Sequence, residues 1–532
     1  MYRQTMLLIF RKSIARLSLH SRVTFSTRQI HKMAMIDYPY EEAVKTLNQL
    51  QGTQMMPLAK KYEGYGLIAM RNFLARVKIT DDDLGGMNIV HVAGTKGKGS
   101  TCAFVESILR HHGVKTGFFS SPHLIEVRER FRVAGKPISR ELFTSYFWQV
   151  YKLLELDKDI YDVEFPSYFY FLTVLGFYIF KHEKVDAAIF EVGIGGTYDC
   201  TNVVTNPTVC GVSSLGIDHT NLLGDTIASI AWHKAGIFKS GVSAFTVLQP
   251  LNGLEVLQEV AKKKQACLNI AQDFTTYTAK QNVNLGLSGE YQKVNASLAI
   301  ELANCWLLKQ LGVSLFSGEK LDKNTVDGLA NCEWNGRAQV IKFDSMTFYL
   351  DGAHTMRSVK CATEWFQKES DAEAAKLSKP CTKTLVFNVT KKRDAYSFLS
   401  TLYQCNFSKA IFVPNIATLL PTHLNDQNNL QCPVESRLAQ VLQNKDEWNA
   451  LCKDNNDLMV AEQSYVFACI ADAIVWMSKG RDDKLQQVAQ LLCLENSWPN
   501  HPCGSDHLQV LITGSLHLVG GCLRVLKPNL ND

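Results

Sequence analysis

The chain has 532 residues, of which 46% are hydrophobic and 20% charged, a composition typical of a globular protein long enough for two or more domains. Its formal net charge of +5 comes from the N-terminus, since residues 1–32 contain seven basic residues and no acid. The remaining residues include 49 basic and 51 acidic residues, so that part of the chain is nearly neutral. This balance gives no indication of nucleic-acid binding, and no stretch is long and apolar enough for an integral membrane segment.

The first 32 residues have the composition of a mitochondrial presequence, since they are rich in Arg and Ser and free of acids. Apolar residues recur along one helical face of this segment, at Leu7, Phe10, Ile14 and Leu17. A tail with no targeting role is the alternative. Translation from Met33 or Met35 would omit the segment. We therefore expect a mitochondrial matrix form, for which association with the inner membrane stays open, and a cytosolic form.

Fifteen cysteines are scattered through the apolar segments without a C-x-x-C pair. An odd number in this arrangement favours reduced core thiols over a disulfide framework and argues against a structural zinc site. Reduced thiols fit both the cytosol and the mitochondrial matrix.

Strand-like apolar runs alternate with helical segments from residue 36 to 335. The expected strands are Met87–Val92, Thr116–Phe119, Ala187–Val192, Val209–Ser213 and Ala244–Leu248. The expected helices are Glu42–Leu50, Leu67–Val77, Leu142–Leu154, Tyr168–Lys181, Ile227–Ala235 and Tyr291–Leu311. This alternation predicts an α/β domain with a mostly parallel sheet covered by helices on both faces. Ligands of such domains bind where the strands end.

Residues 336–532 are expected to form a smaller, Rossmann-like α/β domain. Its expected strands are Met346–Leu350, Thr384–Asn388, Lys409–Phe412 and Val510–Thr513. Its expected helices are Thr355–Lys368 and Ser464–Ser478. The polar regions 415–460 and 495–506 are expected to be irregular surface insertions.

A glycine-rich turn, HVAGTKGKGS at residues 91–100, stands between a predicted strand and the helical segment Thr101–His112. This order typically cradles phosphate, because backbone N–H groups and the helix dipole attract negative charge. Lys98 can then reach the outer phosphates. The turn departs from a strict Walker A pattern, since Val92 replaces its first glycine and Gly99 follows the lysine. A purely structural turn is the alternative to a site for a nucleoside triphosphate.

Three further candidates follow predicted strands, and one lies on a helix. Glu191 ends a strand, where a carboxylate beside a phosphate turn commonly holds Mg²⁺, although it can also simply face solvent. Ser121 can bind a cation or cap a turn. His219 is an unusual Mg²⁺ ligand in a loop, and Lys234 lies on a helical segment that leads back toward the sheet edge. Taken alone, the last two are more typical of surface residues.

Long segments resemble the folylpolyglutamate synthase family of the Mur ligase superfamily, most closely its eukaryotic members. These segments lie in family order from about residue 40 to the end, and they are HVAGTKGKGSTCAFVESIL, KTGFFSSPHLIEVRERFRVAGKPIS, FEVGIGGTYDCTN, SLGIDHTNLLGDTIASIAWHKAGIFKSG, EWNGRAQV, LDGAHT and VLITGSLHLVGG.

The resemblance implies a role for each candidate residue. Residues 36–335 would bind ATP and folate, and residues 336–532 would form the glutamate-ligase domain. ATP phosphates would lie against Gly97, Lys98, Gly99 and Ser100. The Mg²⁺ ligands would be Ser121, Glu191 and His219. Lys234 matches a lysine that is carbamylated in the superfamily, Arg337 and Asp351 match nucleotide contacts, and His354 matches a residue of the glutamate half of the reaction.

The implied reaction is ATP-dependent ligation of L-glutamate to the γ-carboxylate of tetrahydrofolates and their polyglutamates through an acyl phosphate, which retains folates for one-carbon metabolism. The implied cofactors are ATP and Mg²⁺, with a monovalent cation as a further candidate, and the chain is expected to act as a monomer without nucleic-acid or integral-membrane partners. A dihydrofolate synthase is the first alternative. A folate- or nucleotide-binding protein without activity is the second.

Two features near the expected substrate sites leave alternatives open. The arginines of the segment 121–139 either meet the anionic polyglutamate tail or pair with Glu126 and Glu129 within the loop. The chain also departs from the family pattern at NVTKKRD (388–394), at Asn335 and at His233. These departures leave open the loop geometry near the glutamate pocket and the environment of Lys234.

Overall fold

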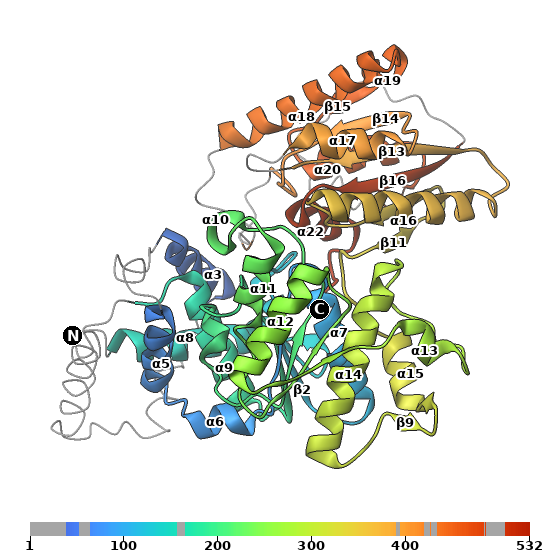
Figure 1. Cartoon of the computed structure of the whole chain (residues 1–532). Helices are drawn as coiled ribbons and strands as arrows, with labels where there is room; N and C mark the ends of the chain where they lie inside the picture. The colour runs from blue at the N-terminus through green and yellow to red at the C-terminus, as the bar shows by residue number, and fades with distance from the viewer. Residues whose placement is uncertain are drawn as a thin grey trace.

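The structure of the chain is a computed structural model, which describes residues 39–52, 64–156, 165–389, 394–419, 426, 434–483, 485 and 506–531. Two α/β domains lie one above the other, with α22 (Leu516–Leu526) and β11 (Gln339–Lys342) near their junction (Figure 1). The predicted presequence, residues 1–32, lies outside the described residues. Within the described ranges, no helix combines the length and the apolar character needed to cross a membrane.

The first sheet has eight strands in the order β4-β3-β2-β5-β1-β6-β7-β8. All neighbours from β2 to β8 pair in parallel, and only β3 and β4 run antiparallel at one edge. Every residue of β1, β2, β5 and β6 is buried, as expected for strands covered on both faces. The strands are β1 Val90–Ala93, β2 Thr116–Phe119, β3 Phe131–Val133, β4 Lys136–Pro137, β5 Ala187–Glu191, β6 Val209–Val212, β7 Ser243–Thr246 and β8 Cys267–Ile270.

Helices cover both faces of this sheet, which confirms the predicted fold class. Adjacent strand residues point to opposite faces, so that Phe119 packs in a core with α5, α8 and α9, whereas Phe118 packs in a second core with α7 and α14. The helices are α3 Tyr40–Gln49, α5 Tyr65–Arg76, α6 Asp81–Gly86, α7 Lys98–His111, α8 Arg140–Leu156, α9 Tyr168–His182, α10 Thr220–Leu223, α11 Ile227–Ala235, α12 Leu251–Lys264, α13 Phe274–Thr278, α14 Tyr291–Leu311 and α15 Lys323–Ala330.

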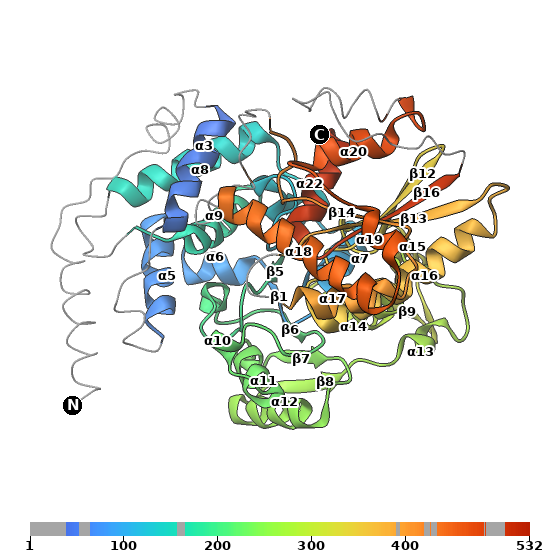
Figure 2. The same ribbon diagram turned by 90° about the horizontal axis from the view of Figure 1, so that it is seen from above.

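The second sheet has the order β11-β12-β16-β13-β14-β15 and is parallel except for β11. One face packs against α20 and α22 and the other against α16, α17 and α18. From above, these orange and red elements overlie the centre of the first sheet (Figure 2). The remaining elements are β12 Met346–Leu350, β13 Cys381–Phe387, β14 Lys409–Phe412, β15 Ser464–Val466, β16 His507–Thr513, α16 Met356–Ala374, α17 Ala395–Tyr403, α18 Val434–Asp454, α19 Leu458–Glu462 and α20 Ile470–Ser478.

Two expectations for the second domain were wrong. The segment Ser464–Ser478 is not one helix, because its first residues pair with β14 as β15 and the helix α20 begins only at Ile470. The region 415–460 is not irregular throughout, because it contains the helix α18. Buried Val441, Trp448 and Cys452 form a narrow stripe on that helix within an otherwise polar sequence. Most of the other predicted insertion, 495–506, lies outside the described residues.

Candidate active site

The phosphate-binding turn lies where β1 meets α7. Gly97 precedes the first helical residue, Lys98, with φ of +87°. A Cβ added to Gly97 would lie 2.0 Å from Asn295 Oδ1, so the position requires glycine for two independent reasons. Ser100 is buried in the first turn of the helix. The turn therefore presents the start of a 14-residue helix, as the sequence predicted, and such a helix start attracts anions.

Two lysines converge on the carbonyl oxygen of Gly94, the first residue of this turn. Lys98 Nζ donates to it at 3.1 Å and Lys234 Nζ at 2.7 Å. Lys234 lies near the end of α11 with only 3% of its surface exposed. Burial lowers the pKa of Lys234 well below its usual value, and the nearby charge of Lys98 lowers it further. The pocket thus favours a neutral amine at this position.

Glu191 and Ser121 lie together beside the turn. Glu191 ends β5 opposite Val92 of β1, and its Oε2 accepts a hydrogen bond from the backbone N–H of Ser121 at 3.0 Å. Burial raises the pKa of Glu191, whereas the charge of Lys98 and the Ser121 N–H act in the opposite direction. The sheet order β2-β5-β1-β6 therefore brings Ser121, Glu191 and the phosphate turn to the same edge.

His219 follows the next strand, β6, and completes this row of strand ends. It is exposed, precedes α10 and has a left-handed backbone with φ of +53°. Desolvation of the ring by its surroundings and the charge of Lys98 lower its pKa, against the opposing effect of Asp218. Among the described residues no group of three or more His, Cys, Asp and Glu side chains could hold a metal. The predicted Mg²⁺ ligands Ser121, Glu191 and His219 do not form such a group, because one of the three is a serine.

The second domain contributes Arg337 and Asp351 to the same region. Asp351 follows β12 and is buried, and its Oδ2 accepts hydrogen bonds from Ala338 N at 2.9 Å and from Tyr291 Oη at 3.1 Å. Burial raises the pKa of Asp351, and Arg337 counteracts this. Arg337 also lowers the pKa of Glu191. Asp351 thus connects the segment that carries Arg337 to α14 of the first domain.

His354 reaches the first domain through a contact that the sequence did not predict. Lys96 Nζ lies 3.1 Å from Asp218 Oδ2 and 3.2 Å from His354 Nε2. Burial tends to raise the pKa of Asp218, but the charge of Lys96 holds it at about 2. Lys96 and Asp218 both stand inside motifs that the sequence analysis quoted, TKGKGS and GIDHTN. The charged residues in these motifs were the only sequence signal for Lys96 and Asp218. Nothing in the sequence indicated that Lys96 contacts His354 of the second domain.

The arginines of the segment 121–139 are engaged within the loop. Arg128 Nε donates to Glu126 Oε2 at 2.6 Å, and Arg130 Nε donates to His123 Nδ1 at 3.0 Å. Both arginines are buried. Glu129 accepts hydrogen bonds from the backbone N–H groups of residues 124–126. These contacts favour the alternative in which the arginines bind partners within the loop over the one in which they form a free cationic surface.

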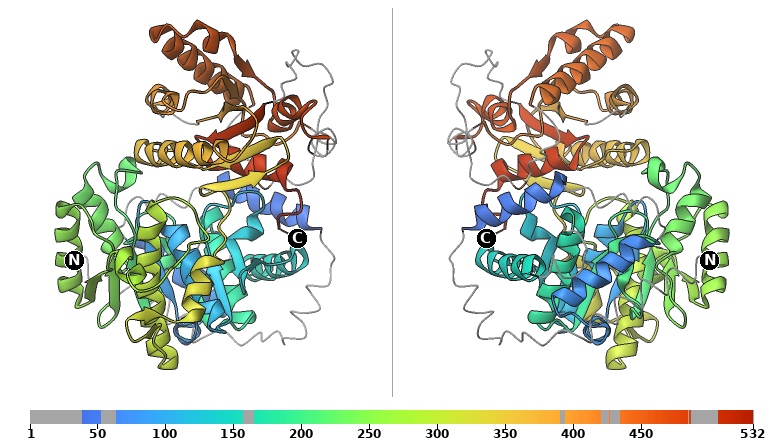
Figure 3. Two further views of the ribbon diagram at one scale, coloured as in Figure 1. Left: turned by 90° about the vertical axis from the view of Figure 1, so that its right-hand side faces the viewer. Right: turned by 90° about the vertical axis from the view of Figure 1, so that its left-hand side faces the viewer.

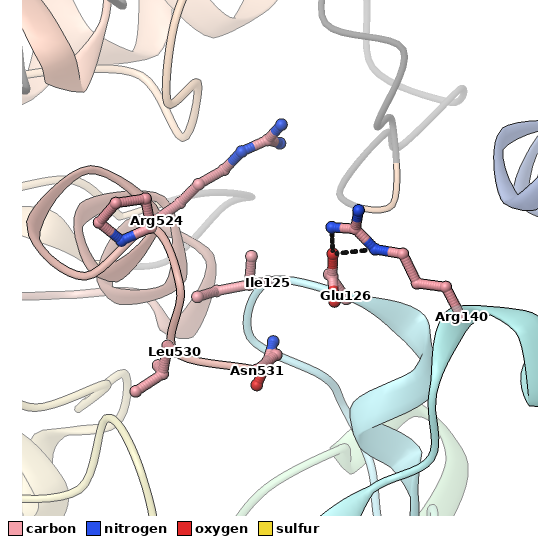
Figure 4. A pocket seen from close by; sticks show the side chains of 7 residues that line it. Ile125, Glu126, Arg140, Arg524, Leu530 and Asn531 are labelled. Atoms are coloured by element: carbon pink, nitrogen blue, oxygen red, sulfur yellow. Dashed lines mark hydrogen bonds and ion pairs between the residues drawn. The ribbon is translucent and has the colours of Figure 1, made fainter.

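The C-terminus lies beside the first domain (Figure 3), and the C-terminal segment contacts this loop. Arg128 Nη2 donates to the backbone oxygen of Asn531 at 2.9 Å, and Asn531 Nδ2 donates to Glu129 Oε1 at 2.7 Å. Figure 4 shows a pocket between this loop and the C-terminal segment, in which Arg140 pairs with Glu126. The pocket is lined by Ile125, Glu126, Arg140, Arg524, Pro528, Leu530 and Asn531.

A second pocket connects this region to the site. It shares Leu530 and Asn531 with the first pocket and extends to Trp334 and Arg337. The guanidinium of Arg132 lies over the Trp334 ring, 5.5 Å from its centroid. An apolar ring and a planar cation on one wall suit a flat, partly anionic ligand.

Comparison with known proteins identifies the family. The chain is 42% identical to the human protein named folylpolyglutamate synthase, mitochondrial, over 93% of this chain and 92% of that one. It is 38% identical to the folylpolyglutamate synthase of Arabidopsis thaliana, over 94% of this chain and 90% of that one. The chain belongs to the folylpolyglutamate synthase family. A scan against protein-family models gave no match.

Solved structures show that the fold is the one seen in folylpolyglutamate synthases. The Mycobacterium tuberculosis folylpolyglutamate synthase complexed with ADP superposes with a TM-score of 0.66 at 22% identity, covering 92% of this chain and 98% of that one. Escherichia coli FolC in complex with DHPP and ADP gives a TM-score of 0.62 at 23% identity, covering 93% and 99%. These likenesses confirm the predicted two-domain α/β architecture.

Proposed function

We propose that this folylpolyglutamate synthase family member catalyses the ATP-dependent addition of L-glutamate to the γ-carboxylate of tetrahydrofolates and of their polyglutamates. One observation carries the proposal: the phosphate-binding turn, a buried carboxylate and two lysines meet at one sheet edge, with Arg337 of the second domain nearby. The names of the eukaryotic relatives give the substrate class. The solved relatives complexed with ADP support ATP as the nucleotide.

The chemistry proceeds in two steps. A folate γ-carboxylate oxygen attacks the γ-phosphorus of ATP, the bond to the ADP oxygen breaks, and an acyl phosphate forms. The neutral amine of glutamate then attacks the acyl carbon, loses a proton and expels phosphate. Carboxylate and triphosphate repel each other, and Lys98 at the helix start reduces that repulsion. Exclusion of water protects the acyl phosphate from hydrolysis. Closure of the two domains over the site would exclude water, and Arg337 and Asp351 would link nucleotide binding to that closure.

We assign a magnesium site to Ser121, Glu191 and His219, together with the nucleotide phosphates. A buried carboxylate that already accepts a backbone N–H on one oxygen offers the hard oxygen ligand that Mg²⁺ prefers. When bound, Mg²⁺ would neutralise charge on the transferring phosphoryl group. Ser121 and Glu191 hold each other in place at adjacent strand ends, and His219 lies one strand beyond the turn.

Lys234 is proposed to carry a carbamate. The neutral amine attacks the carbon of CO₂, the new N–C bond forms, and the amine loses one proton to solvent. The lowered pKa of Lys234 supplies the neutral amine, with burial as the main cause. The product is an anion beside Lys98, where the unmodified ammonium would be repelled. A monovalent cation near this anion stays a further candidate.

The experiment that tests the proposed function resolves products by chain length. Purified residues 33–532 are incubated with Mg-ATP and labelled glutamate, with tetrahydrofolate in one reaction and dihydropteroate in the other. We expect a ladder of extended tetrahydrofolates and no product from dihydropteroate. A single product from dihydropteroate alone would instead establish a dihydrofolate synthase, and no product from folded protein would indicate a binding protein without activity.

Residues 1–32 are proposed to direct one form of the chain to the mitochondrial matrix, and translation from Met33 or Met35 to give a cytosolic form. The human, Cricetulus griseus and Bos taurus relatives are named mitochondrial, which supports the first form. A fluorescent fusion of residues 1–40 should enter mitochondria, and a cytosolic fusion would refute the matrix form. The boundary at residue 336 and the monomeric state are further proposals, testable by limited proteolysis and by light scattering.

A further inference from the structure

Lys96 belongs to the phosphate-binding turn, which is hydrogen-bonded to the loop after β6. The backbone N–H groups of Thr95 and Lys96 both donate to Ser214 O, at 3.0 and 3.1 Å. Thr95 Oγ1 and Gly216 exchange two hydrogen bonds, at 3.0 and 3.1 Å. The turn and the loop after β6 therefore form one unit. Asp218, in that loop, accepts a hydrogen bond from the Lys96 ammonium at 3.1 Å.

His354 is held just as firmly in the second domain. Its backbone N–H donates to Ser358 Oγ at 3.1 Å, within the capping box formed by Thr355 and Ser358 at the start of α16. Its Nδ1 lies 2.8 Å from Gly352 O. Since a carbonyl oxygen only accepts, Nδ1 carries the proton, and Nε2 of the neutral ring is the acceptor that faces Lys96.

One ammonium group therefore joins two fixed turns that belong to different domains. An ammonium only donates, and the Lys96 Nζ to His354 Nε2 distance of 3.2 Å fits a charge-assisted hydrogen bond. A second contact connects the same two elements, since Arg357 Nη1 of α16 donates to Leu215 O at 3.3 Å. Lys96 differs from Lys98, which points back to Gly94 O in its own turn.

We propose that Lys96 is a positioning residue that holds His354 of the second domain against the phosphate-binding turn, and so couples occupation of that turn to glutamate capture. The inference rests on the proposed function, since it concerns the glutamate half of that reaction. The contact fixes the imidazole as a neutral hydrogen-bond acceptor facing the phosphate-binding turn. Without it, His354 keeps its link to Gly352 but loses this hydrogen bond to the first domain.

The test separates glutamate capture from nucleotide binding. In Lys96→Met we expect the KM for glutamate to rise about ten- to a hundredfold, the size expected for a lost hydrogen bond to a charged group. The Kd for Mg-ATP, measured by calorimetry, should stay within about twofold of wild type. A raised Kd for Mg-ATP with an unchanged glutamate KM would overturn the inference, because Lys96 would then serve the phosphates directly. Lys263→Met, which removes an exposed lysine paired with Glu259, is the matched control.

A double-mutant cycle shows whether Lys96 acts through His354. We expect Lys96→Met to change kcat/KM for glutamate by less than about twofold when it is added to His354→Ala, because the partner is already absent. Full multiplication of the two losses would overturn the inference. Wild-type enzyme in the same assay reports on the proposed function separately. If it forms no extended folate, that function and this inference both fail, whereas a wild-type ladder with an unchanged glutamate KM in Lys96→Met overturns the inference alone.

Discussion

Lys98 and Lys234 donate to one acceptor, the carbonyl oxygen of Gly94, from the start of α7 and the end of α11. A charged ammonium at both positions would bring two like charges to one carbonyl oxygen, where little water reaches Lys234 to screen them, so Lys234 favours its neutral form. A phosphate bound between the two side chains, or conversion of Lys234 to a carbamate, would place a negative charge beside Lys98 instead. A negatively charged group bound at this end of the sheet would therefore be stabilised electrostatically.

Substitution of Lys234 by Met should stabilise the protein in CO₂-free buffer at neutral pH. The pKa of Lys234 in the folded protein lies well below 10.5, so the unfolded chain binds more protons between that lowered pKa and 10.5. The stability of the wild type therefore rises with pH across this window, and the advantage of Lys234→Met should shrink as the pH rises through it. Urea unfolding at a series of pH values measures this, and a pH-independent difference would contradict it.

The same substitution should nearly abolish ligase activity, because Met cannot form a carbamate. A mass spectrum of wild-type protein under native conditions with bicarbonate should show one added CO₂ that is lost on acidification. Lys264→Met provides a comparison, because Lys264 also donates to a backbone carbonyl, that of Gly236, but is less buried. An adduct of equal amount in Lys234→Met would place the modification elsewhere.

Glu191→Gln should lower turnover at least about a hundredfold, because the proposed Mg²⁺ would lose its one carboxylate ligand and with it much of the charge stabilisation of the transferring phosphoryl group. The amide oxygen can still accept the Ser121 N–H, and burial disfavours the charged carboxylate, so the free energy of unfolding should not fall. Steady-state kinetics with thermal unfolding separates the two effects. Glu259→Gln on the exposed face of α12 is the control, and wild-type turnover in Glu191→Gln would remove Glu191 from the site.

Gly97→Ala should weaken Mg-ATP binding more than tenfold. The new Cβ meets Asn295 Oδ1, so either that side chain or the turn must shift, and φ of +87° disfavours any residue with a Cβ in the present shape of the turn. Gly113→Ala is the matched control, since Gly113 has φ of +81° with nothing within 4 Å of an added Cβ. That control should lose only about 1 kcal/mol of stability through backbone strain and keep its nucleotide affinity. Equal ATP affinities in both variants would contradict this account of the turn.

Much of the site could be predicted because its residues stand at the ends of apolar strands. The runs that became β2 and β5 were recognisable from sequence, and parallel strands deliver Ser121 and Glu191 to one edge whatever the details of packing. Lys96 and Asp218 were missed for a physical reason. Their importance depends on His354, which lies 258 residues from Lys96 in the chain, and no local pattern encodes that contact.

The second domain shows a different limit. The helix α18 buries Trp448 completely, yet its polar residues mask the apolar stripe. In Ser464–Ser478 the strand β15 and the helix α20 follow each other without a turn signal of Gly or Pro. The apolar run fits either a strand or a helix by its sequence pattern alone. Pairing with β14, a tertiary contact, decides where the strand ends.

The most direct test of the central claim, that this site uses ATP to activate a carboxylate, follows an oxygen atom. Tetrahydrofolate labelled with ¹⁸O in its γ-carboxylate is converted with Mg-ATP and glutamate, and the released phosphate is analysed by mass spectrometry. We expect one ¹⁸O atom in the phosphate released with the first glutamate added to each labelled folate, because the bridging oxygen of the acyl phosphate comes from the folate carboxylate. Phosphate from later additions carries no label, since these activate the carboxylate of an unlabelled glutamate. Unlabelled phosphate from the first addition would contradict an acyl phosphate and the roles assigned to this site.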